Sequence, residues 1–208
     1  MSEAPLTGVA GRPLSSRGAR TRRRLLEAAE AVFAELGYHE ASIVKITEAA
    51  GVGQGTFYLY FASKKDIFDE LVLDLNHRVR QAMTEAASRG GTRAERELLG
   101  FTAFFRFTAE HPALYRIIRQ AEFVSPEMLH RHYERLTEGY VAGLRQAMED
   151  GEIAQGDPEV LAWALMGIGE LVGMRWILWA ESDELPAEVS EQLAAIIRRA
   201  IGSVEDGR

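Results

Sequence analysis

The chain of 208 residues contains no cysteine, which excludes disulfide bonds and thiolate metal sites. It also lacks the HExxH zinc motif, the glycine-rich phosphate-binding loop and the nucleophile elbow of hydrolases. Its histidines have no metal-ligand spacing, because the nearest pair, His130 and His132, stand two apart on a predicted helix and point to different sides. We therefore expect a protein that is not an enzyme and that holds no metal or other cofactor.

Signals for export and for membrane insertion are weak. The first sixteen residues, MSEAPLTGVAGRPLSS, show no basic flank followed by an apolar run, so no signal peptide is expected. The most apolar window, Val160–Ala180, is long enough to span a membrane, but Glu170 and Arg175 interrupt it. We predict that this window is a buried helix, and that the protein is cytoplasmic and has no membrane partner.

Strand signals are scarce as well, since the sequence has no sustained period-two run and no Asn-Gly hairpin. Apolar stripes of helical spacing fill the chain instead, and capping residues such as Ser63, Thr92 and Asp157 open them. With 47% hydrophobic residues to build a core, the sequence predicts an all-α fold. Nine helices are expected, three in an amino-terminal head and six in a body, at about residues 17–36, 43–50, 54–60, 64–88, 92–110, 112–124, 126–150, 158–180 and 186–201.

The net charge of −7 is unevenly distributed. Residues 1–65 carry a net charge of +3, whereas the remainder carries −10. The first predicted helix opens with the basic run Arg17–Arg24, which opposes the helix dipole and so does not serve local stability. Neutralisation of DNA phosphates accounts for the run, and a merely solvated charge cluster is the alternative.

The stretch Ile43–Phe61, IVKITEAAGVGQGTFYLYF, is typical of a helix-turn-helix, whose second helix enters the major groove of DNA. Gly51 permits the left-handed conformation that the turn requires, and Gly55 lets the second helix lie close to the DNA backbone. Gln54 pairs well with adenine, and with Thr56 and Tyr58 it forms the candidate set for base contact. Phe57 and Phe61 are expected in the core, packed on Phe33 and Ile46.

Several residues of this stretch stand at the spacing of a family signature: Ala50-Gly51-Val52, Gly55-Thr56-Phe57-Tyr58, Phe61 and Ser63-Lys64. Through them, the segment from Arg17 to Val72 resembles the TetR family of transcriptional regulators. The resemblance implies that Tyr60 and Lys64 contact DNA phosphates. Gly53 and Gln54 depart from the family, which often has Ser at the first position and Lys or Arg at the second, and this departure bears on which DNA is read.

Further phosphate contacts are expected at the amino end of the helix that supports the recognition helix, where free backbone N–H groups attract an anion. The complete predicted DNA-binding set is Arg17, Arg20, Thr21, Ser42, Lys45, Gln54, Gly55, Thr56, Tyr58, Tyr60 and Lys64.

Aromatic side chains crowd the middle helices of the body, where the resemblance implies a small-molecule pocket. Both a pocket and an ordinary core fit such a cluster. Glu170 shares a face with apolar residues and needs a partner, either a buried arginine or a ligand. The predicted ligand-binding residues are Phe101, Phe104, Phe105, Tyr115, Ile118, Arg119, Phe123, Met166, Glu170 and Met174. An aromatic, arginine-containing site suits a lipophilic anion such as an acyl thioester.

The last two predicted helices are expected to form a homodimer interface, because two reading heads give the specificity that one head lacks. An apolar stripe on the last helix supports this, although the stripe also suits packing on its own body. The predicted interface residues are Trp163, Gly169, Gly173, Val189, Leu193, Ile196, Ile197 and Ala200.

The sequence therefore predicts three parts: a tail at 1–16, a helix-turn-helix DNA-binding domain at 17–65, and a ligand-binding and dimerisation domain at 66–208. The expected function is a repressor that binds double-stranded DNA at a palindromic operator and is released by a small molecule. A regulator without a ligand and a ligand-dependent activator are the alternatives.

Overall fold

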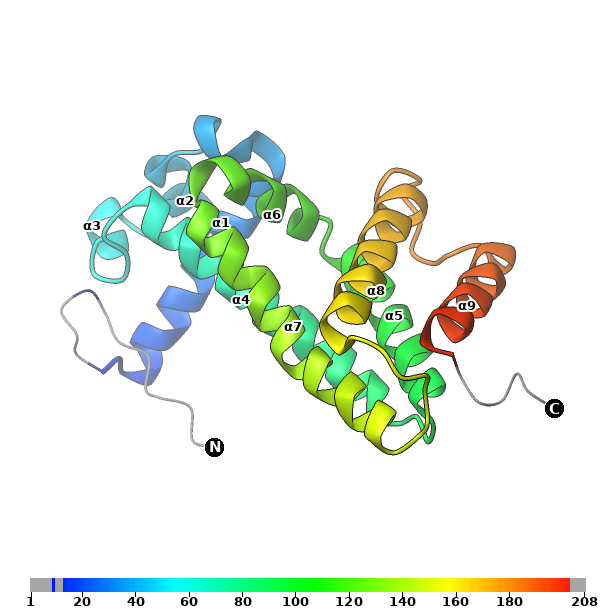
Figure 1. Ribbon diagram of the computed structural model, residues 1–208. Helices are drawn as coiled ribbons and strands as arrows, with labels where there is room; N and C mark the ends of the chain where they lie inside the picture. Colours follow the sequence, from blue (N-terminus) through cyan, green and yellow to red (C-terminus); the bar gives the residue numbers. More distant parts are fainter. Residues whose placement is uncertain (1–8, 10–12, 203–208) are drawn as a thin grey trace. The chain divides into compact units, whose positions relative to one another are not determined.

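The computed structural model describes residue 9 and residues 13–202, so most of the predicted tail at 1–16 lies outside the described residues. The described part is all-α, as predicted, with nine α-helices and one π-helical turn (Figure 1). The elements are α1 (Ser16–Glu40), α2 (Ile43–Ala50), α3 (Gln54–Phe57), α4 (Lys64–Ala87), α5 (Arg93–Glu110), α6 (Ala113–Val124), α7 (Pro126–Glu149), α8 (Pro158–Gly173), the π-helix η1 (Met174–Leu178) and α9 (Ala187–Ile201).

The helix starts follow the capping residues closely. The Thr92 hydroxyl accepts the Glu95 N–H while the Glu95 carboxylate accepts the Thr92 N–H, which is the predicted capping box. The Asp157 carboxylate accepts the first two free N–H groups of α8. Ser63 accepts the Asp66 N–H, but the Asp66 carboxylate accepts the N–H of Ala62 instead of that of Ser63.

The chain forms two compact units, and α4 and α7 each contribute residues to both of them. Unit 1 comprises residues through Leu75 together with Ala113–His130, and unit 2 comprises Asn76–Pro112 and the chain from Arg131 onward. Unit 1 therefore holds α1, α2 and α3 and, in addition, α6, which packs along α1 (Figure 1).

The core of unit 2 joins α5, α7, α8 and α9. Phe101 of α5 lies against α8, where a Cβ added to Gly169 would stand 3.0 Å from Cε1 of the Phe101 ring. Because a larger residue would crowd the ring, Gly169 lets α8 lie close to α5 of the same chain. The buried members of this core are Ala94, Phe101, Phe105, Leu144, Ala147, Met148, Ile153, Ala162, Leu165, Ile177, Leu193, Ile197 and Ile201.

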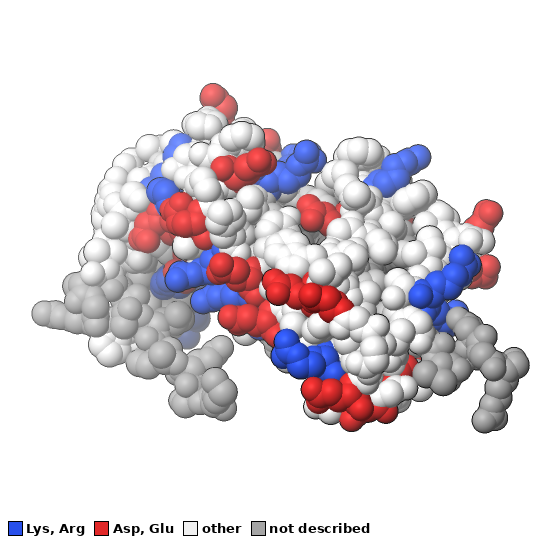
Figure 2. Space-filling view, in the orientation of Figure 1, with Lys and Arg blue, Asp and Glu red and all other residues white. Residues whose placement is uncertain are grey.

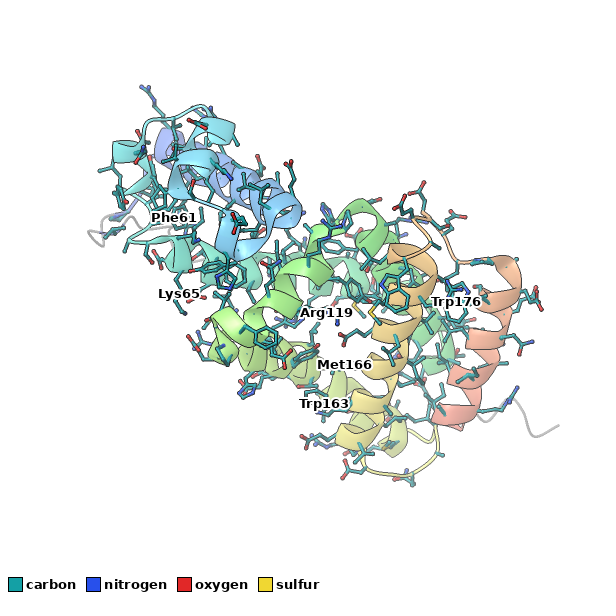
Figure 3. All side chains as sticks on the ribbon, turned by 90° about the horizontal axis from the view of Figure 1, so that it is seen from above. Phe61, Lys65, Arg119, Trp163, Met166 and Trp176 are labelled. Atoms are coloured by element: carbon teal, nitrogen blue, oxygen red, sulfur yellow. The ribbon has the colours of Figure 1, made fainter. Side chains whose placement is uncertain are left out.

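The apolar segment Pro158–Leu178 is less buried than the sequence predicts. This 21-residue segment is long and apolar enough to span a membrane, with a mean hydropathy of 1.4 over an 18-residue window, yet only 28% of that window lies inside the protein. Figure 3 labels Trp163 and Met166 on this helix, and Trp163 is 46% exposed. The expectation of a buried helix is therefore wrong, because one face of α8 remains open to solvent.

Acidic and basic side chains are interspersed along α7 on the face that Figure 2 draws. This pattern matches the sequence of α7, in which Glu127, Glu134, Glu138 and Glu149 alternate with Arg131, Arg135 and Arg145. A surface of mixed sign is not one that a nucleic acid would select.

Candidate DNA-binding site

The helix-turn-helix is built as the sequence predicts. Ser42 caps α2, since its hydroxyl accepts the Lys45 N–H at 3.2 Å. Gly51 ends α2 in the left-handed conformation, with φ 62° and ψ 41°, and its N–H donates to Glu48 at 3.0 Å. The chain then turns through Val52 and Gly53 into α3, which is only four residues long and carries no side-chain cap.

Buried aromatic rings hold α3 in place. The side chains of Phe57 and Phe61 are 0% and 1% exposed, which confirms their prediction as core residues, and their ring centroids lie 5.6 Å apart. Burial of this side leaves Gln54, Gly55 and Tyr58 on the exposed side of the short helix. The candidate base-reading residues therefore share a surface that faces solvent, and Thr56 beside them is half-buried.

Three arginines of the basic run at the start of α1 already have partners within the head. Arg22 forms an ion pair with Glu70 at 2.8 Å and lies over the Phe61 ring, and Arg23 pairs with Glu27 at 3.1 Å. Arg24 donates from Nη2 to the carbonyl oxygen of Ala50, the last residue of α2. These three arginines bind the head together.

Arg17 and Arg20, the two arginines predicted to contact phosphate, are exposed. The Thr21 hydroxyl donates to the Arg17 carbonyl within α1, so this side chain is turned toward its own helix in the free protein. Tyr60 is half-buried, and its hydroxyl lies 3.5 Å from the position of a Cβ at Gly18. The roles of these residues toward DNA stay predictions.

Lys64 and Lys45 differ in their surroundings. The Lys64 ammonium donates to the carbonyl oxygens of Tyr38 at 2.7 Å and Ala41 at 2.8 Å, and the side chain is half-buried. Lys45 is exposed, and its ammonium donates to the Glu40 carbonyl at 3.1 Å. Of the two predicted phosphate contacts, Lys45 is the more accessible.

The predicted ligand-binding residues fall in both units. Tyr115, Ile118, Arg119 and Phe123 belong to α6 in unit 1, where Tyr115 and Ile118 are buried and Phe123 is 82% exposed. The others lie in unit 2: Phe101 and Phe105 are buried in the core, whereas Phe104, Met166, Glu170 and Met174 are half-buried.

Glu170 has a polar partner within unit 2. The Tyr133 hydroxyl donates to the Glu170 carboxylate at 3.1 Å, and the Tyr133 ring packs on Trp163 with centroids 5.7 Å apart. The contact joins α7 to α8.

Two buried polar clusters of unit 2 have no sequence signature. Asn76 of α4 contacts His132 of α7, and burial lowers the pKa of His132 to about 4. Arg93 and Glu97 of α5 form a buried ion pair that the Tyr140 hydroxyl joins through Glu97, and burial, followed by the charge of Glu97, raises the pKa of Tyr140. Only the four-residue spacing of Arg93 and Glu97 could have suggested one of these contacts.

A glycine-turned pair of short helices, a solvent-facing recognition helix and exposed arginines on the preceding helix together define a helix-turn-helix DNA-binding protein. Residues 25–71 match the family described as "Bacterial regulatory proteins, tetR family". The chain is 31% identical over 191 residues to the HTH-type transcriptional regulator YdgC of Bacillus subtilis, a match that covers 88% of this chain and 94% of that protein. The chain belongs to the tetR family of bacterial transcriptional regulators.

Two further relatives extend the comparison beyond the head. The fatty acid metabolism regulator protein of Bacillus subtilis is 27% identical over 180 residues, which cover 84% of this chain and 92% of that protein. The crystal structure of the transcriptional regulator FadR from Bacillus subtilis in complex with stearoyl-CoA has the same fold, with a TM-score of 0.74 and 24% identity over 86% of this chain and 98% of that one. Both similarities include the body as well as the head.

Proposed function

We propose that this regulator is a repressor that binds a palindromic operator as a homodimer and leaves it when a long-chain acyl thioester binds the body. The observation that carries the proposal is the similarity to a fatty acid metabolism regulator over 84% of the chain, which includes the helices where a ligand would bind. The fold is shared with a regulator crystallised with stearoyl-CoA. We infer a cytoplasmic location, because operator DNA is found there.

Within unit 2, we assign the ligand-facing surface to one stripe of α8 and η1. Met166, Glu170 and Met174 recur every four residues, and all three are half-buried instead of packed in the core. The flexible methionines suit an acyl chain, while the Tyr133–Glu170 contact supplies a polar group beside them. The π-helical turn that begins at Met174 locally widens the helix, a distortion that is frequent at functional sites.

The ligand acts by differential affinity, because it can shift the protein away from the operator only if it binds the released state more tightly. Operator release should therefore be measured by fluorescence anisotropy with stearoyl-CoA, free coenzyme A and stearate. We expect release and an increase in melting temperature with stearoyl-CoA only. Operator affinity unchanged at saturating stearoyl-CoA contradicts the ligand assignment, and tighter operator binding contradicts release by the ligand.

The Met174→Lys variant tests the location of the ligand. A lysine in the apolar stripe should abolish the stearoyl-CoA response while operator binding is retained. The matched control is Arg175→Lys, at an exposed neighbour of Met174 in the same π-helical turn, which should respond as the parent protein does.

The homodimer is inferred from the open apolar face of α8, η1 and α9. Its exposed side chains include Val160, Trp163, Leu171, Trp179 and Ile196, each between 46% and 67% exposed. Four residues that the sequence predicted at the interface are buried within unit 2, beneath these exposed side chains: Gly169, Gly173, Leu193 and Ile197. Several large apolar side chains left exposed on neighbouring elements indicate an interaction site, and in a DNA-binding protein a second copy is the partner that supplies a second reading head.

A further inference from the structure

The junction between α1 and α2 has an unusual backbone. Gly37 interrupts α1 with φ 75° and ψ 168°, a conformation that is essentially restricted to glycine. After this kink, the short turn Tyr38–Ala41 carries carbonyl oxygens that the end of a helix leaves without intrahelical donors. The position of α2 depends on this turn, because Ser42, the N-cap of α2, follows it directly.

The Lys64 side chain satisfies three of these carbonyls, and the Lys45 ammonium donates to the fourth, that of Glu40. The Lys64 Nζ lies 2.7 Å from the Tyr38 oxygen, 2.8 Å from the Ala41 oxygen and 3.4 Å from the His39 oxygen. The same ammonium lies 4.4 Å from the centroid of the Tyr38 ring. An ammonium has three N–H donors, and this set of acceptors uses all three, so a DNA phosphate would have to displace one of them.

A second contact holds the same turn from α6. The Gln120 carboxamide oxygen accepts the Tyr38 N–H at 2.5 Å, and its amide nitrogen donates to the Arg116 carbonyl at 3.0 Å. Arg116 also donates to the Ala34 carbonyl, one turn before the kink, at 2.6 Å. The backbone of Tyr38 is therefore held through its C=O by Lys64 and through its N–H by Gln120.

We propose that Lys64 is a positioning residue for operator recognition and not a phosphate contact. Its ammonium fixes the α1–α2 turn, the turn fixes α2, and α2 fixes the recognition helix α3. Specific base contacts need side chains placed to within about 0.5 Å, whereas non-specific binding depends on charge and tolerates such shifts. Removal of the Lys64 ammonium should therefore reduce specific recognition more than it reduces binding to random DNA.

The salt dependence of DNA binding separates the two roles, because removing one phosphate-binding cation lowers the slope of log Kobs against log salt by about 0.9. For Lys64→Met, we expect operator affinity to fall by about tenfold or more, random-duplex affinity to change less than about twofold, and the salt slope to stay as in the parent protein. Arg20→Met, at an exposed residue that the sequence predicts to contact phosphate, is the control, in which both affinities and the salt slope should fall together.

Two other variants keep the test decisive if Lys64→Met folds poorly, as judged by circular dichroism and melting. Lys64→Arg retains the charge and would preserve a phosphate contact, but the planar guanidinium does not reproduce the three-carbonyl geometry, so operator affinity should still fall. Gln120→Ala should reproduce the loss of specificity without a change in salt slope. Equal losses on both DNAs with a reduced slope in Lys64→Met, or a Lys64→Arg variant that binds operator like the parent, overturns the proposal.

Discussion

The side-chain amide of Asn76 donates to the backbone carbonyl of His132 at 2.9 Å and lies 3.1 Å from Nδ1 of the same residue, with both side chains buried. Asn76 belongs to α4 and His132 to α7, so the pair joins two helices of unit 2. With its pKa lowered to about 4, the imidazole is neutral at pH 7, and Nδ1 can accept the second amide N–H of Asn76.

This pair predicts acid sensitivity. The folded pKa of His132 lies below the ordinary value of 6.5, so between about pH 6.5 and pH 4 the unfolded chain binds more protons, and stability falls as pH falls. From pH 7 to pH 5 the loss attributable to this residue is about 2 kcal/mol. Denaturant melts of the parent and of His132→Asn across that range measure it, since the variant should lose less stability over the interval. Parallel stability curves for the two proteins would exclude this role.

Substitutions of two glycines in the helix-turn-helix should affect protein stability and operator binding differently. A Cβ at Gly55 meets no atom within 4 Å, so Gly55→Ala should stabilise the protein by up to about 1 kcal/mol. It should nevertheless weaken operator binding, because the added methyl group lies on the exposed surface that approaches DNA. Gly51→Ala is the complementary variant, and its positive φ predicts a loss of about 1–2 kcal/mol in stability. Melting curves and operator titrations of both variants check the pair, and undiminished DNA affinity in Gly55→Ala contradicts a close approach at this position.

Gln54 should set base preference. It is exposed at the start of α3, and its carboxamide matches the N6 and N7 edge of adenine. Gln54→Ala should relax discrimination at one base pair of each half-site by about 1–3 kcal/mol, and Gln54→Arg should shift preference there toward guanine. Selection from a randomised duplex pool with each variant reads this out. Identical selected sequences would remove Gln54 from the base-reading set.

The oligomeric state should depend on the exposed face of α9. Ile196 is 47% exposed, and burying a glutamate at that position against a second copy carries a desolvation cost, so Ile196→Glu should shift the protein toward monomer. Ser190→Glu places the same charge at an exposed position elsewhere on α9 and serves as the control. Light scattering after size-exclusion chromatography measures both masses. An unaltered dimer in Ile196→Glu would place the interface elsewhere.

Local chemistry made much of the head predictable. The Ser42 cap, the left-handed Gly51 and the burial of Phe57 and Phe61 each follow from residue type and spacing within a few positions. The Thr92–Glu95 capping box was predictable for the same reason. These features depend on neighbours in the chain, which is the information that a single sequence carries.

Contacts between distant segments were not predictable. Lys64 reaches the Tyr38 carbonyl and Arg24 reaches the Ala50 carbonyl, each across 26 residues, so no periodicity links the partners. A lysine or arginine in a basic DNA-binding segment suggests a contact with a DNA phosphate. Only the geometry shows that the side chain donates to a backbone carbonyl oxygen instead. The close approach of Gly169 to the Phe101 ring was likewise not predictable from the sequence.

The contacts of α6 with the backbone at Ala34 and Tyr38 limit how the helix-turn-helix can be moved into another protein. Arg116 and Gln120 stand 82 residues after the α1 backbone groups that they bind. A fusion protein that keeps only residues up to 65 would therefore contain those backbone groups without their partners. A chimera that borrows this operator specificity should carry residues 113–130 together with the amino-terminal segment. The predicted base-reading residues lie in one continuous segment, but the segments needed to keep that segment folded are not continuous in the sequence.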